Sequence, residues 1–214
     1  MAYQGAIAAG KGAMQAMRTA ADAAFSAAKT AGQKSYEAVQ WAAKGCYDTA
    51  IKAGQTAEEA AAQVRSAFSG LVSRGGANTA GMSEAEVAKA VEQGVASASK
   101  ETATKAALTA RISTGANAAY ASAIKAGQSA GQACRTAAMY AYDMAIRAGT
   151  ATKEALVYAY NAAREAAIKA GQSIQEAAQT AKQSVMSLVG RNGATKADAI
   201  AAVEEAGIMS RFGT

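Results

Sequence analysis

The hexapeptide AIKAGQ occupies residues 50–55 and recurs unchanged at residues 123–128 and 167–172. Variants at residues 6–11, 28–33 and 145–150 complete two series of three copies, and neighbouring copies in each series start 22 positions apart. Five residues after each glycine stands a Gln or Glu, and several copies place a Ser or Thr two residues after it: Thr56, Ser129 and Ser173. This order is typical of a left-handed glycine that ends one helix, followed by a capping box that begins the next. The sequence therefore predicts helices of about 18 residues separated by tight turns.

A second periodicity gives the same glycines another interpretation. Segments such as MRTAA and VQWAA lie midway between the hexapeptides, which produces a repeat of 11 residues. Eleven residues complete three helical turns, so this repeat suits a long continuous helix in a right-handed supercoil, with the glycines as contact points. A Lys or Arg just before four of the glycines complements a helix C-terminus and favours the turns. The long continuous helix is the alternative.

The sequence also indicates a tandem duplication. An offset of 117 residues aligns residues 2–77 with residues 119–194 without a gap, and 34 of these 76 pairs are identical. We expect a first helical half at residues 1–97, a connector at 98–117 and a second helical half at 118–214. Each half is predicted to hold three helices of about 18 residues and one short helix, which follows a Gly-rich loop.

Alanine dominates the composition and decides the fold class. The 214 residues include 64 Ala but only 26 Leu, Ile, Val and Phe together, and no Pro. Such a sequence strongly favours helices, so we expect an all-α fold rather than a β-sandwich or a doubly wound sheet. Because Ala buries little surface, the core must come from close approach of helix backbones.

The residue types that are missing narrow the possible chemistry. The chain has no His, and Cys46 and Cys134 fit no metal or redox spacing, so we expect no metal site, cofactor or catalytic centre. Each thiol aligns with a small or apolar residue of the other half, which predicts buried packing. No apolar run approaches the length of a membrane span, and no signal peptide is evident. We expect a virion or intracellular protein without a small-molecule substrate.

The charge balance points to a polyanion partner. The 22 Lys and Arg exceed the 16 Asp and Glu, which gives a net charge of +6 and a pI of about 9.3. Arg74 and Arg191 occupy equivalent positions in Gly-rich loops, whose backbone can approach a phosphate closely. Arg18 and Arg135, each followed by a Thr in both halves, are the next candidates. We predict nucleic-acid contacts at these four arginines, with solvated surface charges as the alternative.

The aromatic residues gather in two stretches of the chain. Because Leu is scarce, these rings are the largest apolar groups available, and we expect core or subunit-interface packing. A base-stacking platform is the alternative. The residues are Tyr36, Trp41 and Tyr47 in the first half, and Tyr140, Tyr142, Tyr158 and Tyr160 in the second.

The chain is small, internally repeated, rich in Ala, Gln and Ser, and poor in Cys and His. In this combination it resembles coat and nucleocapsid proteins of archaeal filamentous and spherical viruses. The resemblance implies a non-enzymatic subunit that packs against copies of itself and coats nucleic acid. The 11-residue pattern, as in EAAQTAKQ at residues 176–183, resembles the repeats of late-embryogenesis-abundant proteins. It implies the alternative function, a stress-protective or surface-active protein that acts in desiccation or at ice or membrane surfaces.

Overall fold

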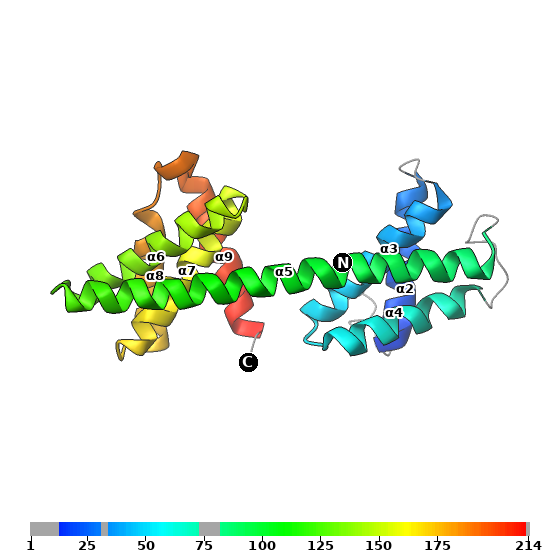
Figure 1. Ribbon diagram of the computed structural model, residues 1–214, viewed down its shortest axis with the longest axis horizontal. Coiled ribbons are helices and arrows are strands. Elements are labelled where there is room, and N and C mark those ends of the chain that lie inside the picture. Colours follow the sequence, from blue (N-terminus) through cyan, green and yellow to red (C-terminus); the bar gives the residue numbers. More distant parts are fainter. Residues whose placement is uncertain (1–12, 31–33, 73–81, 213–214) are drawn as a thin grey trace. The chain divides into compact units, whose positions relative to one another are not determined.

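The computed structural model describes residues 13–30, 34–72 and 82–212, and the regular structure in these ranges is entirely helical (Figure 1). The expected all-α class is confirmed, since the described residues form eight α-helices and no strand. In chain order the elements are α2 (Ala13–Thr30), α3 (Ser35–Lys52), α4 (Ala57–Val72), α5 (Glu84–Lys125), α6 (Ala130–Arg147), α7 (Thr152–Lys169), α8 (Ile174–Met186), the 3-10 turn η1 (Arg191–Gly193) and α9 (Lys196–Phe212).

The chain divides into two compact units, Met1–Ala103 and Thr104–Thr214, which we call the first and second unit. The boundary lies inside α5, a helix of 42 residues that includes the whole predicted connector, residues 98–117. The fourth helix of each half was expected to be short, and this was wrong. No Gly followed by a capping Ser or Thr interrupts α5 after Glu84, so the helix continues through the connector. The corresponding α9 has 17 residues.

The glycines of the hexapeptides end helices, as the turn interpretation predicts. Gly171 has a φ of +87°, a left-handed conformation that glycine adopts without a steric penalty. Its N–H donates to the carbonyl of Ile168 at 2.9 Å, and the next N–H donates to the carbonyl of Ala167 at 3.1 Å. These two bonds form a Schellman motif. The same pattern occurs at Gly54, Gly127 and Gly149, so a continuous helix through these four positions is wrong. Gly10 and Gly32 lie outside the described residues.

Capping boxes begin the helices after most of these turns. At α8, the backbone N–H of Glu176 donates to the Ser173 hydroxyl, and the Glu176 carboxylate accepts the Ser173 N–H at 2.9 Å. Each bond satisfies a backbone donor that the helix leaves unpaired. The caps of α3 and α7 lack such a side-chain bond. Equivalent pairs begin α4, α5, α6 and α9, namely Thr56–Glu59, Ser83–Glu86, Ser129–Gln132 and Thr195–Asp198.

The cores consist mainly of alanine, and their pattern follows the offset of 117 residues. Helices α2 and α6, like α3 and α7, begin and end at positions separated by 117. The buried face of α3 includes Ala38, Val39 and Ala42, and that of α7 includes the aligned residues Ala155, Leu156 and Ala159. Side chains this small let neighbouring helices approach closely, so packing compensates for the scarcity of Leu.

The larger buried groups occupy isolated positions in these alanine cores. Tyr47 and Tyr142 are completely buried, whereas Trp41 keeps 61% of its surface exposed. Core packing is therefore confirmed for the two tyrosines, whereas Trp41 lies outside the core of its unit, and packing at a subunit interface stays a prediction for it. Cys46 and Cys134 are buried, as predicted. Burial raises the pKa of the Cys46 thiol to about 12 and raises that of Cys134, so both thiols stay protonated at neutral pH.

Candidate polyanion-binding site

The loop that carries Arg191 is fixed to the core of the second unit. Gly190 and Asn192 both have positive φ, which lets the chain reverse between α8 and α9. The hydroxyl of Tyr142 in α6 donates to the carbonyl oxygen of Arg191 at 2.9 Å. Because the ring of Tyr142 is completely buried, this bond ties η1 to the interior of the unit. Arg191 thus occupies a defined position.

The Arg191 guanidinium forms a bidentate ion pair with Asp143 of α6. Its Nε lies 3.0 Å from one carboxylate oxygen, and its Nη2 lies 2.7 Å from the other. The hydrogen bond to Asp143 raises the pKa of Arg191 above its ordinary value. The expectation for Arg191 was a phosphate contact or a solvated charge, so this ion pair within the unit was not predicted. The aligned residue of the other half is Ser26, so the comparison of halves carried no signal for Asp143.

A hollow of about 360 Å³ brings Arg191 and Arg135 together. It lies between the beginning of α6 and the chain that follows α8. Arg135 is exposed, and no described residue forms a hydrogen bond or an ion pair with it. Two of the four predicted arginines, 56 positions apart in the chain, therefore line one depression. The remaining lining residues are Gln128, Gln132, Thr136, Met139, Ser187 and Leu188.

The other two predicted arginines belong to the first unit. Arg18 is half-buried in α2, and its Nε is buried without a hydrogen-bond partner. Arg74 lies outside the described residues. Among the described members of this set, the structure brings together Arg135 and Arg191.

Two polar residues of the hollow are retained in the other half of the chain. Gln132 and Thr136 flank Arg135 on the same helix, and both are identical in the other half, as Gln15 and Thr19. In both halves the Thr hydroxyl donates to the carbonyl of that Gln, at 3.2 Å in α6 and 3.0 Å in α2. Residues retained one helical turn apart can therefore mark a shared surface. Ser187 has no comparable signal.

The chemistry of the hollow fits anion binding. Two guanidinium groups and no carboxylate line the hollow, and the carboxylate of Asp143 is paired with Arg191. Guanidinium groups present several N–H donors in a plane, which suits the oxygens of a phosphate or carboxylate. The hollow contains no thiol or imidazole that could act as a nucleophile or base. Its arrangement can hold and orient an anion.

The surplus positive charge belongs almost entirely to the second unit. The first unit has ten basic and nine acidic residues, whereas the second has twelve basic and seven acidic residues. Six of the seven carboxylates in the second unit are held in ion pairs or helix caps. Exposed cations of this unit that pair with no described residue are Arg111, Lys125, Arg135, Arg147, Lys182 and Lys196.

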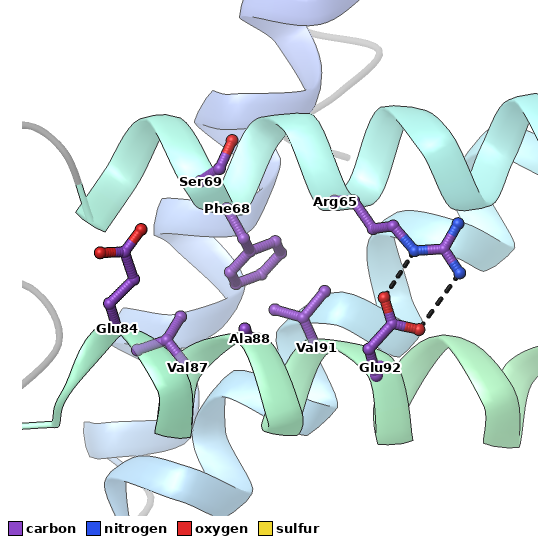
Figure 2. Close-up of a pocket in the computed structure, with 8 residues that line it drawn as sticks. All are labelled: Arg65, Phe68, Ser69, Glu84, Val87, Ala88, Val91 and Glu92. Atoms are coloured by element: carbon purple, nitrogen blue, oxygen red, sulfur yellow. Dashed lines mark hydrogen bonds and ion pairs between the residues drawn. The ribbon is translucent and has the colours of Figure 1, made fainter.

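A second hollow, of about 210 Å³, lies in the first unit between α4 and α5 (Figure 2). Phe68 points from α4 toward α5, where Val87 and Val91 lie on the opposite wall. Arg65 closes one end, and its Nε and Nη2 lie 2.6 and 3.1 Å from the Glu92 carboxylate. The hydrogen bond to Arg65 lowers the pKa of Glu92. The interior is apolar and offers room for a small apolar group, but no chemistry for a reaction.

The described part of the chain lacks two further kinds of site. These residues contain no group of three or more His, Cys, Asp or Glu that could hold a metal ion. None of the described helices combines the length and the apolar character that crossing a membrane requires.

Comparison with protein families, with curated proteins and with solved structures finds no match to this chain. The resemblance to viral coat proteins therefore rests on composition and repeats alone. Function has to be inferred from the charges, contacts and exposed groups of the two units.

Proposed function

We propose that this chain is a structural protein that assembles with copies of itself and binds the phosphates of a nucleic acid. The observation that carries the proposal is the net positive charge of the second unit, which has twelve basic and seven acidic residues. Since six of those carboxylates are engaged within the unit, a group of exposed cations is left for an external anion.

Arg135 is the cation that we expect to make the best-defined contact. It lines the hollow and pairs with no described residue, and Arg191, which Asp143 holds in place, lines the same hollow. Contacts of this kind hold the sugar–phosphate backbone and do not read base sequence. We therefore expect binding that is independent of sequence and strongly dependent on salt.

Self-assembly is supported by the apolar side chains that the second unit leaves exposed. Ile174 is 68% exposed, and Ile168 on the other side of the Gly171 turn is 42% exposed. Burying such groups against a second copy would add apolar area that the alanine cores supply only sparingly. A coat or nucleocapsid subunit is the specific form of this proposal, in keeping with the resemblance of the chain to such proteins.

The test is the binding of a labelled 30-base-pair DNA duplex to the full chain, measured by fluorescence anisotropy over a range of salt concentrations. Each phosphate contact contributes about 0.9 to the slope of log affinity against log salt. We expect Arg135→Ala to reduce the magnitude of that slope by about 0.9. Lys153→Ala is the matched control, because it removes one charge from the same unit where Glu205 already pairs with the cation at 2.8 Å.

The proposal fails if the duplex does not bind at low salt, or if Arg135→Ala and Lys153→Ala change the slope equally. In the first case the stress-protective or surface-active alternative becomes the better account of the chain. Light scattering at micromolar concentration tests assembly separately. A mass that stays at 21.4 kDa would contradict the assembly part of the proposal.

A further inference from the structure

The single tryptophan of the chain is unusually exposed. Trp41 lies on α3 and keeps 61% of its surface accessible, although a large apolar ring gains most from burial. The Nζ of Lys44 lies 5.9 Å from the centroid of the ring, within reach of a cation–π interaction. Lys44 also pairs with Glu101 at 2.6 Å. A cation held by Glu101 therefore lies beside the indole, while most of the ring stays uncovered.

A hollow of about 280 Å³ beside Trp41 contains unused hydrogen-bonding groups. Gln40 of α3 and Gln93 of α5 form a side-chain hydrogen bond with each other. Whichever glutamine donates, this bond leaves one amide oxygen and one amide NH₂ group that bond to no described residue. Ser97 adds a hydroxyl at the same place. A donor and an acceptor therefore stand next to an exposed aromatic ring.

Gly94 explains why the two glutamines meet. A Cβ at this position would lie 2.5 Å from the carbonyl oxygen of Gln40 and 2.9 Å from the Cβ of Ala43. Only glycine lets α5 approach α3 this closely. The close approach brings Gln93 beside Gln40 and forms the floor of the hollow.

We propose that Trp41 is a stacking platform for one unpaired nucleobase, whose edge bonds to the free groups of Gln40 and Gln93. Indole rings stack on bases without regard to sequence, and a glutamine amide matches the adjacent donor and acceptor on a base edge. The volume is below the range for drug-sized ligands, which suits one ring and not a whole dinucleotide. The inference rests on the proposed function, since it takes nucleic acid as the ligand and adds that single strands are recognised.

The experiment uses the intrinsic fluorescence of the full chain, because Trp41 is its only tryptophan. Titration with a twelve-residue oligothymidylate at low salt is expected to quench the emission to a plateau. An abasic strand of the same length carries the same phosphates but no bases, and it should leave the emission unchanged. A DNA duplex should also leave it unchanged, because its bases are already stacked and paired.

Variants test the same site by an independent readout, the anisotropy of labelled oligothymidylate. Loss of one stacked base weakens single-strand binding by roughly fivefold to a hundredfold, so we expect this loss for Trp41→Leu. Trp41→Tyr should retain most of the affinity. The matched control is Tyr140→Leu, which removes an aromatic ring that is 36% exposed in the second unit and should leave the affinity unchanged.

Equal quenching by the abasic strand or by the duplex would overturn the inference. So would an emission shift that follows protein concentration without any DNA, because Trp41 would then lie between copies of the chain. The two proposals fail separately. Duplex binding that depends on Arg135, with no quenching by oligothymidylate, overturns only the stacking site. Quenching by oligothymidylate without duplex binding overturns only the proposed function.

Discussion

Two glycines near the end of α3 should respond in opposite ways to the same substitution. Gly54 follows the helix with a φ of +86°, whereas Gly45 lies inside the helix. A Cβ added at either position meets no other atom within 4 Å. Gly54→Ala and Gly45→Ala therefore differ in backbone conformation and not in packing.

The expected magnitudes follow from that difference. An L-residue in the left-handed conformation costs about 1–2 kcal/mol, of which about 0.4–1 kcal/mol is offset because Ala restricts the unfolded chain. We expect Gly54→Ala to lower the free energy of unfolding by about 1 kcal/mol. Gly45→Ala should raise it by about 1 kcal/mol, the difference in helix propensity. The two variants should therefore differ by about 2 kcal/mol.

Urea unfolding followed by the fluorescence of Trp41 provides the assay, because Trp41 lies on the helix that carries both positions. With a slope of about 2 kcal/mol per M urea, each midpoint should move by about 0.5 M, in opposite directions. Equal slopes would show that only stability has changed. If Gly54→Ala stabilises the protein as Gly45→Ala does, Gly54 lies within a continuous helix and the turn is wrong.

Three further pairs of measurements probe the contacts of the two units. Tyr142→Phe removes the hydroxyl that donates to the Arg191 carbonyl, so it should lower the free energy of unfolding in urea by about 1 kcal/mol. Tyr47→Phe removes a buried hydroxyl without a hydrogen-bond partner, so it should leave the free energy of unfolding unchanged or raise it. Gly94→Ala should lower the free energy of unfolding by about 1–3 kcal/mol in the same assay, because the added Cβ would lie against the backbone of α3. Gly115→Ala should cost less, because the atoms nearest to its added Cβ belong to the ring of Tyr140, a partly exposed side chain that can turn away. The hydrogen bonds from the Ser173 side chain and backbone lower the pKa of Glu176 below its ordinary value of 4.5. The ionised Glu176 carboxylate therefore stabilises the folded chain fully above pH 4.5, and this stabilisation is lost as the pH falls through the lowered pKa. Glu176→Gln keeps a capping box of the kind found in α6 but removes the charge, so its melting temperature should fall less between pH 7 and pH 3 than that of the unchanged protein. Equal falls in the two proteins would contradict the stabilising role of the Glu176 charge.

Local chemistry made the helices of this chain predictable. The hexapeptide places the carbonyls of Ala167 and Ile168 where the N–H groups at Gly171 and the next residue can reach them, so the turn depends on neighbouring residues alone. The same is true of the cap formed by Ser173 and Glu176. Interactions that join residues three to five positions apart can be predicted from the sequence alone.

The candidate sites depended on contacts that no local pattern specifies. Arg191 and Asp143 are 48 positions apart, and Arg135 shares a hollow with Arg191 only because α6 packs beside the end of α8. Trp41 was expected in a core or an interface, since its sequence context does not say which side of α3 is covered. Side-chain size and charge were visible in the sequence, but the partner of each group was not.

The sequence by itself determined the fold class, the helix ends and most of the caps, because alanine content, glycine spacing and capping residues act within a few positions. Tertiary structure alone decided the length of α5, the pairing of Arg191 with Asp143 and the exposure of Trp41. The physical reason is range. Hydrogen bonds at helix ends join residues that are close in sequence, whereas burial and ion pairing depend on which helices pack together. Because the alanine faces of the helices are similar in size and polarity, the sequence of one helix does not specify its packing partner.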